Sequence, residues 1–167
     1  MICDDVSGCA HLFGGERALS EDILARLARQ GLRAEVGLAD TVGCAWAAAR
    51  YGETPLVPKG ATRDSLLPLS LVALRLGGKI VSGLAQAGLK RIADVVDRPR
   101  APLAARFGQE FIRRLDQALG CEDESIRPRL PLPSYVAERR FLDPIGREED
   151  VLGTIGQLAQ ELGRQSG

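Results

Sequence analysis

The sequence predicts an α+β fold, in which a small layer of strands and helices precedes a helical block and a final strand–helix pair. Apolar residues alternate in short stretches before residue 57, as in strands, and recur at helical spacing from about residue 68 to residue 119. Two stretches rich in glycine, proline and charge, residues 52–65 and 121–133, are typical of linkers. The chain is therefore expected to contain several small parts.

The first 57 residues should form half of a small α/β sheet layer. The expected elements are a strand, an amphipathic helix, a second strand and an alanine-rich helix, at residues 1–7, 16–30, 33–39 and 42–50. Asp40 or Thr41 is suited to cap the last of these helices. A further short strand is expected at Leu56 and Val57.

The helical block contains a pattern typical of a helix–hairpin–helix. A short helix with an apolar face should end at Gly88, because glycine accepts a left-handed backbone, and a second should begin after Arg91. The residues expected to turn inward are Ile80, Val81, Leu84, Ala87, Ile92, Val95 and Val96. Such a hairpin presents backbone N–H groups to a phosphate and holds a nucleic-acid backbone without reading its sequence. The last helix of the block, at residues 109–119, should expose Arg113 and Arg114.

The formal net charge is zero, but the charge is unevenly distributed. Residues 58–120 carry 11 basic and 5 acidic side chains, a net charge of +6, whereas residues 1–57 and 121–167 each have a net charge of −3. A cationic segment around the hairpin favours a phosphate-bearing partner.

The composition, 45% hydrophobic and 26% charged, is typical of a globular protein. The longest apolar run, residues 66–74, is broken by Pro68 and is far shorter than the ~20 residues of a membrane-spanning helix. None of the four cysteines has CxxC spacing, and the single histidine has no companion for a zinc site. We therefore expect no metal, no cofactor and no membrane partner, and a reduced, cytoplasmic protein.

The C-terminal part should contain a strand at residues 134–142 and an amphipathic helix at residues 147–164. One strand and one helix cannot bury each other well enough to stand alone. We therefore expect them to open a domain that continues beyond the sequence. A strand at the very first residue likewise suggests the downstream part of a larger protein.

Five segments resemble, in the same order, segments of a known family. They are residues 5–16 (DVSGCAHLFGGE), 32–39 (LRAEVGLA), 84–96, 107–120 and those from 134 onward. The first resembles the signature of ImuB-type members of the Y family (DinB/UmuC) of translesion DNA polymerases. The others resemble a palm strand, the thumb hairpin, the end of the thumb and the opening of the little finger of that family.

The resemblance implies a partial palm at residues 1–57, a helical thumb with a helix–hairpin–helix at 58–120, a linker at 121–133 and the start of a little finger at 134–167. It implies a protein of DNA repair, translesion synthesis and SOS mutagenesis that grips primer–template or damaged duplex DNA through its backbone. The expected partners besides DNA are a polymerase and accessory mutagenesis proteins.

The residues expected to contact DNA lie in the two glycine-containing turns of the block and on its last helix. They are Gly77, Gly78, Lys79, Gly88, Leu89, Lys90, Arg91, Arg113 and Arg114. A plain loop is the alternative for the first three, and a solvated helix face for the last two.

The resemblance also implies that no catalytic residue is present. The final aspartate of the family's acidic pattern matches Asp5, which puts the catalytic glutamate at Met1, and the family's phosphate-contacting lysines fall on Val42 and Trp46. Without these groups a polymerase cannot hold its metal ions or align a triphosphate. We therefore expect an adaptor that is not an enzyme.

Two alternatives stay open. The chain could be a truncated remnant of an active Y-family DNA polymerase, in which case the reading frame upstream would encode an acidic strand ending in Asp-Glu. It could instead be a protein-binding scaffold whose hairpin contacts another protein.

Overall fold

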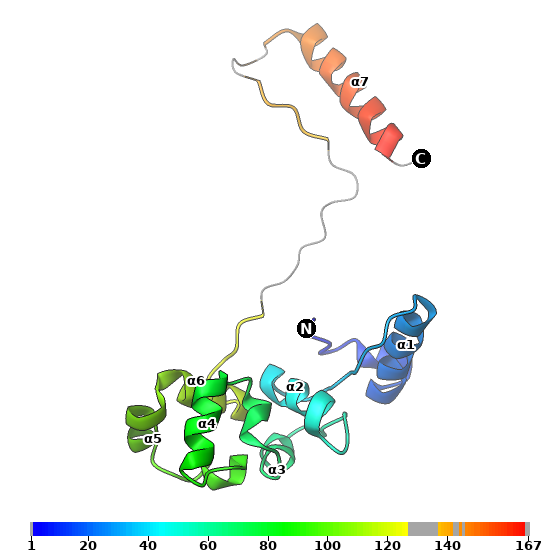
Figure 1. Cartoon of the computed structure of the whole chain (residues 1–167). Coiled ribbons are helices and arrows are strands. Elements are labelled where there is room, and N and C mark those ends of the chain that lie inside the picture. Colours follow the sequence, from blue (N-terminus) through cyan, green and yellow to red (C-terminus); the bar gives the residue numbers. More distant parts are fainter. Residues whose placement is uncertain (1, 127–136, 142–143, 145, 166–167) are drawn as a thin grey trace. The chain divides into compact units, whose positions relative to one another are not determined.

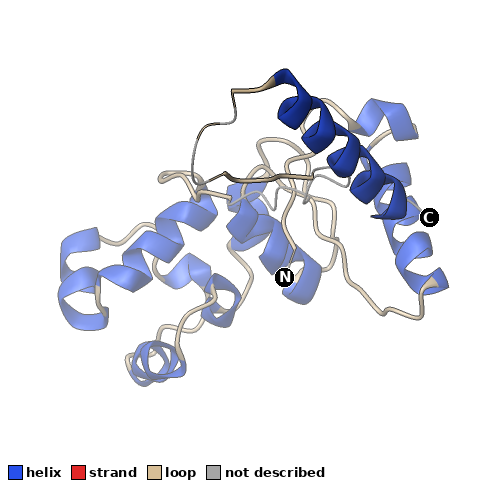
Figure 2. Ribbon diagram, turned by 90° about the horizontal axis from the view of Figure 1, so that it is seen from above, coloured by secondary structure: helices blue, strands red, loops and turns tan. Residues whose placement is uncertain are grey.

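A computed structural model describes residues 2–126, 137–141, 144 and 146–165. Within these ranges the chain is mostly helical, and Figure 2 shows helices joined by loops with no strand among them. The chain divides into two compact units, residues 1–126 and 127–167. No helix in the described ranges is both long and apolar enough to cross a lipid bilayer.

The first unit holds α-helices and short 3-10 helices, labelled η. In chain order they are η1 Ala10–Phe13, α1 Glu16–Arg29, α2 Val42–Tyr51, α3 Thr62–Leu66, η2 Leu71–Leu74, α4 Gly78–Gln86, η3 Ile92–Asp94, α5 Arg100–Phe107 and α6 Gln109–Leu119. Helices α4, α5 and α6 lie together in Figure 1, with α2 and α3 beside them. The second unit contains α7, Glu148–Gln165.

The core is built by α2 and the helical block together. Leu66 of α3, Leu84 of α4 and Phe111 of α6 are fully buried in it. Helices α2 and α6 cross closely, because a Cβ atom on Gly43 would lie 2.8 Å from the Cα of Ala118. A short contact of this kind requires glycine, so Gly43 determines how closely the two helices approach.

The predicted helices at the positions of α1, α2, α4 and α6 are confirmed, whereas the helix expected after Arg91 is only the short 3-10 helix η3. Helix α6 has the predicted bounds, α1 begins at the predicted residue, and α4 ends just before Gly88, whose φ is +78°. Thr41 caps α2, since its hydroxyl accepts a hydrogen bond from the Cys44 amide at 3.1 Å. Asp40 instead accepts a hydrogen bond from the Gly60 amide at 2.7 Å.

The strands predicted at residues 1–7 and 33–39 are wrong. Residues 2–6 are loop, and the Asp5 carboxylate accepts a hydrogen bond from the Ser7 amide at 2.8 Å, which favours a turn. In the second segment a single parallel bridge joins Leu38 to Leu56. Leu38 donates to the Pro55 carbonyl and accepts from the Val57 amide, but Pro55 has no N–H to donate next, so the ladder cannot continue on that side of the bridge.

Two further expectations are corrected by the structure. The end of the predicted linker at residues 52–65 forms helix α3, because Thr62 and Leu66 are buried under α2 and α6. Residues 134–136 and 142 of the strand predicted at residues 134–142 lie outside the described residues, and the described part, 137–141, is loop.

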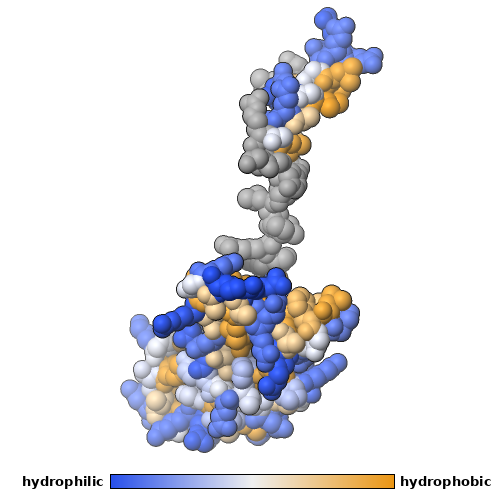
Figure 3. Space-filling model, turned by 90° about the vertical axis from the view of Figure 1, so that its right-hand side faces the viewer, coloured by the Kyte–Doolittle hydropathy of each residue, from blue (hydrophilic) through white to orange (hydrophobic). Residues whose placement is uncertain are grey.

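Helix α7 is amphipathic, and several residues of its apolar face are exposed in the part of its unit that the structure describes. Val151, Leu152 and Ile155 are 38%, 60% and 57% exposed. Figure 3 shows hydrophobic side chains gathered along one side of this helix.

Candidate nucleic-acid interface

The first glycine turn of the block leads from η2 into the N-terminus of α4. Arg75 is the non-glycine residue with a positive φ (+58°) in the described chain, and it turns the backbone toward Gly77, the N-cap of α4. No side chain caps this helix. Within the described residues, the amides of Gly77, Gly78 and Lys79 have no acceptor. These exposed amides can therefore donate to an anion, at the positive end of the helix dipole.

The second glycine turn, at residues 88–91, is closed by its own backbone and by one carboxylate. The amides of Gly88 and Leu89 donate to α4, and those of Ile92 and Ala93 donate to the carbonyls of Leu69 and Leu67. The two amides between them belong to Lys90 and Arg91, and both donate to Asp94 Oδ2 at 2.8 Å. Every amide from residue 88 to residue 93 therefore has an acceptor inside the protein.

The carboxylate of Asp94 occupies the position that a phosphate would need in this second turn. Its hydrogen bonds from the Arg91 and Lys90 amides lower the pKa of Asp94 below its ordinary value, so the group is charged at neutral pH. Leu89 is 8% exposed and belongs to the core. What this turn offers to a ligand is thus the exposed side chains of Lys90 and Arg91 and not their amides.

The two arginines of α6 differ in their surroundings. Arg113 is exposed and forms no ion pair in the described part of the chain. Arg114 is 29% exposed and pairs with Glu124 at 3.0 Å, and the same carboxylate pairs with Arg75 at 2.6 Å. Arg114 is therefore neutralised in this structure, and Glu124, which lies in the predicted linker, is held against the helical block by two arginines.

The charge of the helical block is only partly balanced by ion pairs. Arg63, Arg75, Arg100 and Arg114 each have a carboxylate within 4.0 Å. The basic residues of the block without such a pair, as far as the chain is described, are Lys59, Lys79, Lys90, Arg91, Arg98, Arg106 and Arg113. Across the described residues, no group of three His, Cys, Asp or Glu side chains is placed to hold a metal ion.

Sequence reasoning missed the part that Arg75, Asp94 and Glu124 play around the two turns. Asp94 follows Arg91 by three residues, a spacing at which a carboxylate can accept from the backbone at a helix start, and this local signal could have found it. The contact between Arg75 and Glu124 spans 49 positions and leaves no such signal.

Proteins that match most of the chain include an ImuB protein and DNA polymerases IV. Protein ImuB of Caulobacter vibrioides (strain NA1000 / CB15N) is 41% identical over 148 residues, which are 88% of this chain and 32% of that protein. DNA polymerase IV of Shewanella sp. (strain MR-7) is 29% identical, over 97% of this chain and 48% of that protein. DNA polymerase IV of Shewanella pealeana is 27% identical, over 95% of this chain and 46% of that protein.

No family model matches the chain, and no solved structure matches it. The matches and the order of the segments make the chain a relative of the Y-family DNA polymerases. Within that relationship it is ImuB-like, since its identity to ImuB is 41%, against 29% to a DNA polymerase IV. The chain spans about a third of the length of the ImuB relatives and about half that of the polymerases.

Proposed function

We propose that this chain is a non-catalytic DNA-binding part of a DNA repair protein, acting in translesion synthesis as an adaptor for a partner polymerase. In this proposal residues 1–57 are a partial palm, residues 58–120 a thumb, residues 121–133 a linker and residues 134–167 the start of a little finger. The identity to ImuB and the collinear matches to DNA polymerase IV support this division.

The observation that carries the proposal is the open helix start at Gly77, Gly78 and Lys79. Its amides lack acceptors in the described structure, and it lies in the segment with a net charge of +6. A phosphate of the DNA backbone can accept from these amides while exposed cations approach neighbouring phosphates. Lys90, Arg91 and Arg113 supply such cations in the proposal, and Arg114 can join them only after leaving Glu124.

The non-catalytic part of the proposal depends on α2. The positions where the family carries phosphate-contacting lysines hold Val42 and Trp46. Trp46 packs against the core, and its ring lies 5.6 Å from that of Tyr51. An indole fixed in this way offers no cation to a triphosphate, so binding without nucleotide addition is the expected behaviour.

DNA binding by the full chain can be tested by fluorescence anisotropy with a labelled primer–template at several salt concentrations. Affinity should fall steeply with salt, with a slope of about −0.9 for each neutralised phosphate. Gly77→Asp should weaken binding about tenfold or more, because the new carboxylate would accept from the amides and repel phosphate. The backbone of Gly77 lies in the extended region, so the substitution should not cost stability.

Two controls separate the contributions. Ser82→Asp adds the same charge to an exposed position farther along α4 and should change affinity little. Lys90→Glu with Arg91→Glu should weaken binding, whereas the equal charge change Arg17→Glu with Arg29→Glu on α1 should weaken it less. If DNA affinity did not depend on salt, or if Gly77→Asp and Ser82→Asp weakened it equally, the proposal that the start of α4 binds the DNA backbone would be refuted. Incorporation of dNTPs with Mg²⁺ would refute the non-catalytic assignment.

A further inference from the structure

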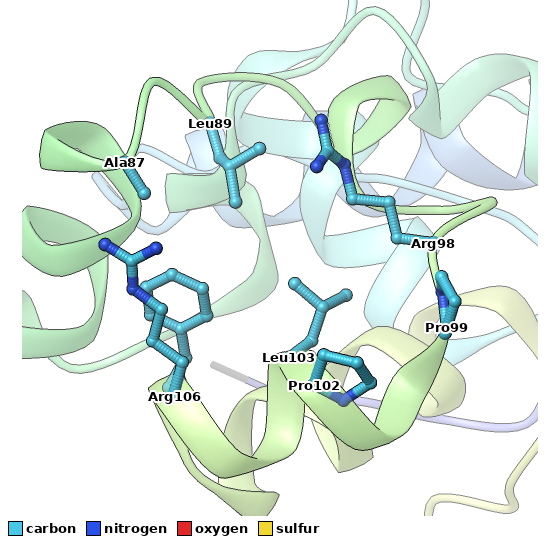
Figure 4. Close-up of a pocket in the computed structure, with 8 residues that line it drawn as sticks. Ala87, Leu89, Arg98, Pro99, Pro102, Leu103 and Arg106 are labelled. Carbon is cyan, nitrogen blue, oxygen red and sulfur yellow. The ribbon is translucent and has the colours of Figure 1, made fainter.

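A hollow of about 270 Å³ lies between the C-terminal end of α4 and helix α5, away from the open helix start. Figure 4 shows Leu89 and Leu103 pointing into it and Arg98 and Arg106 on opposite sides of it. Its volume is just below the roughly 300–1,000 Å³ of pockets that hold whole small molecules. It can therefore take one or two side chains of a partner.

The floor of this pocket is apolar. Leu89 and Leu103 are 8% and 6% exposed, and Phe107 closes the floor beside them. A phosphate loses its hydration in such a place without gaining hydrogen bonds, so the floor suits an apolar side chain and not a nucleic-acid backbone. Pro99 and Pro102 form one edge, and their fixed backbone keeps that edge in place before a ligand arrives.

The rim of the pocket is cationic. Arg98 is positioned by the hydrogen bond from its Nε to the Asp94 carbonyl oxygen at 2.6 Å, and the Arg106 guanidinium lies 5.3 Å from the Phe107 ring centroid. Neither forms an ion pair within the described chain, and no acidic residue lines the pocket. Asp94, whose carbonyl oxygen accepts from Arg98, has its carboxylate engaged by the amides of Lys90 and Arg91.

We propose that this pocket docks an acidic segment of a partner protein, which inserts one apolar side chain between Arg98 and Arg106 and pairs flanking carboxylates with the two guanidinium groups. The apolar floor selects the anchor, and the rim selects the charge of the residues around it. The pocket lies near Ala87, at the opposite end of α4 from Gly78, and nine helical residues span about 13 Å. The peptide site therefore does not use the amides at the start of α4, and this proposal does not depend on DNA binding there.

The test uses the full chain and a short fluorescein-labelled peptide with a Leu-Phe pair between aspartates and glutamates. We expect binding with a Kd on the order of 10–100 μM, as for a small surface pocket. Arg98→Glu with Arg106→Glu should weaken it about tenfold or more, since two surface pairs become repulsive. A peptide with Ser-Ser in place of Leu-Phe should bind at least about tenfold more weakly, because the anchor is lost.

Matched controls decide between this pocket and general attraction of charge. Lys59→Glu with Arg113→Glu makes the same change in net charge at exposed positions outside the pocket, and should leave peptide affinity within about twofold. Gly77→Asp should bind the peptide as the unaltered chain does, so failure of the DNA grip and failure of this site are distinguishable. Equal binding of the two peptides, equal effects of the two double variants, or displacement of the peptide by unlabelled duplex DNA would each overturn the proposal.

Discussion

Replacing Glu124 with glutamine should destabilise the first unit, although this residue lies outside every predicted element. Its carboxylate pairs with Arg75 at 2.6 Å and with Arg114 at 3.0 Å. The three side chains are only 18%, 15% and 29% exposed, so the pairs are better protected from water than ordinary surface pairs. The contact holds the segment after α6 against the turn that precedes α4.

The magnitude follows from these contacts. Each hydrogen bond to a charged group contributes about 1.5–3 kcal/mol, and glutamine keeps the shape and one neutral acceptor. Part of the loss is offset because Glu124 no longer has to be desolvated as an ion. We expect Glu124→Gln to lower the free energy of unfolding by about 2 kcal/mol, which corresponds to a fall in Tm of about 4–8 °C for a chain of this size.

Thermal and urea unfolding followed by circular dichroism measure this difference. The hydrogen bond from Arg75, reinforced by the charges of both arginines, lowers the pKa of Glu124 below 4.5. The stabilisation is therefore complete above this ordinary value and is lost as the pH falls through the lower, folded value. The gap between the unaltered chain and Glu124→Gln should be widest near neutral pH and should narrow in acid.

Glu122→Gln is the matched control, since Glu122 is exposed and has no ion pair in the described structure. It should change stability by no more than about 0.5 kcal/mol. If both variants unfolded alike at neutral pH, the cluster of Glu124 with its two arginines would not exist in solution, and the reasoning would be refuted.

Three further predictions test other parts of the first unit. Gly43→Ala should cost about 1–2 kcal/mol in urea unfolding, because overpacking against α6 exceeds the gain in helix propensity, whereas Gly156→Ala in α7, with open space around it, should not destabilise. Burial raises the pKa of Cys44 to about 11, so mass spectrometry after alkylation at pH 8 should find exposed Cys121 modified long before Cys44; equal rates would contradict its burial. Asp94→Asn should destabilise the unit at neutral pH but not in acid. The pKa of the Asp94 carboxylate is lowered, so its stabilising charge is lost as the pH falls through that pKa. An unchanged Tm at pH 7 would argue against the hydrogen bonds from the Lys90 and Arg91 amides to Asp94.

Helices α1, α2, α4 and α6 were predictable because their signals are local, whereas α3 lies at the end of a predicted linker. The spacing of Phe111, Ile112 and Leu115 between two glycines predicted the bounds of α6. The apolar spacing that ends before Gly31 predicted α1 by the same kind of local signal. The inward positions of Ile92 and Val95 were also predictable, although the expected α-helix there is the short 3-10 helix η3.

Strands were not predictable because a strand depends on its neighbours. Alternation at residues 33–39 indicated a half-buried extended segment, and Leu38 does meet Leu56. A ladder needs successive donors and acceptors, and Pro55, whose carbonyl accepts from Leu38, has no N–H to supply the next donor. The composition of a segment therefore indicated its extended backbone but not whether it would find a partner.

The positive charge around the candidate site was predictable from the sequence, but the hydrogen bonding of its backbone amides was not. The basic segment and both glycine turns were visible in the sequence, but their roles depend on which amides are already used. Asp94 satisfies the turn at residues 88–91, and nothing in the described chain satisfies the start of α4. The same contacts decide which arginines remain available, since Glu124 engages Arg75 and Arg114 and leaves Arg113 exposed.

The hydroxyl of Thr41 accepts from the Cys44 amide and donates to the Ala118 carbonyl at 2.8 Å, beside the close approach of Gly43. One side chain thus joins the first turn of α2 to the last turn of α6. A shortened protein that began at residue 58 would lack α2, and the surface of α6 around Ala118 would be exposed to water. A shortened form of the protein that keeps this contact must therefore begin before Thr41.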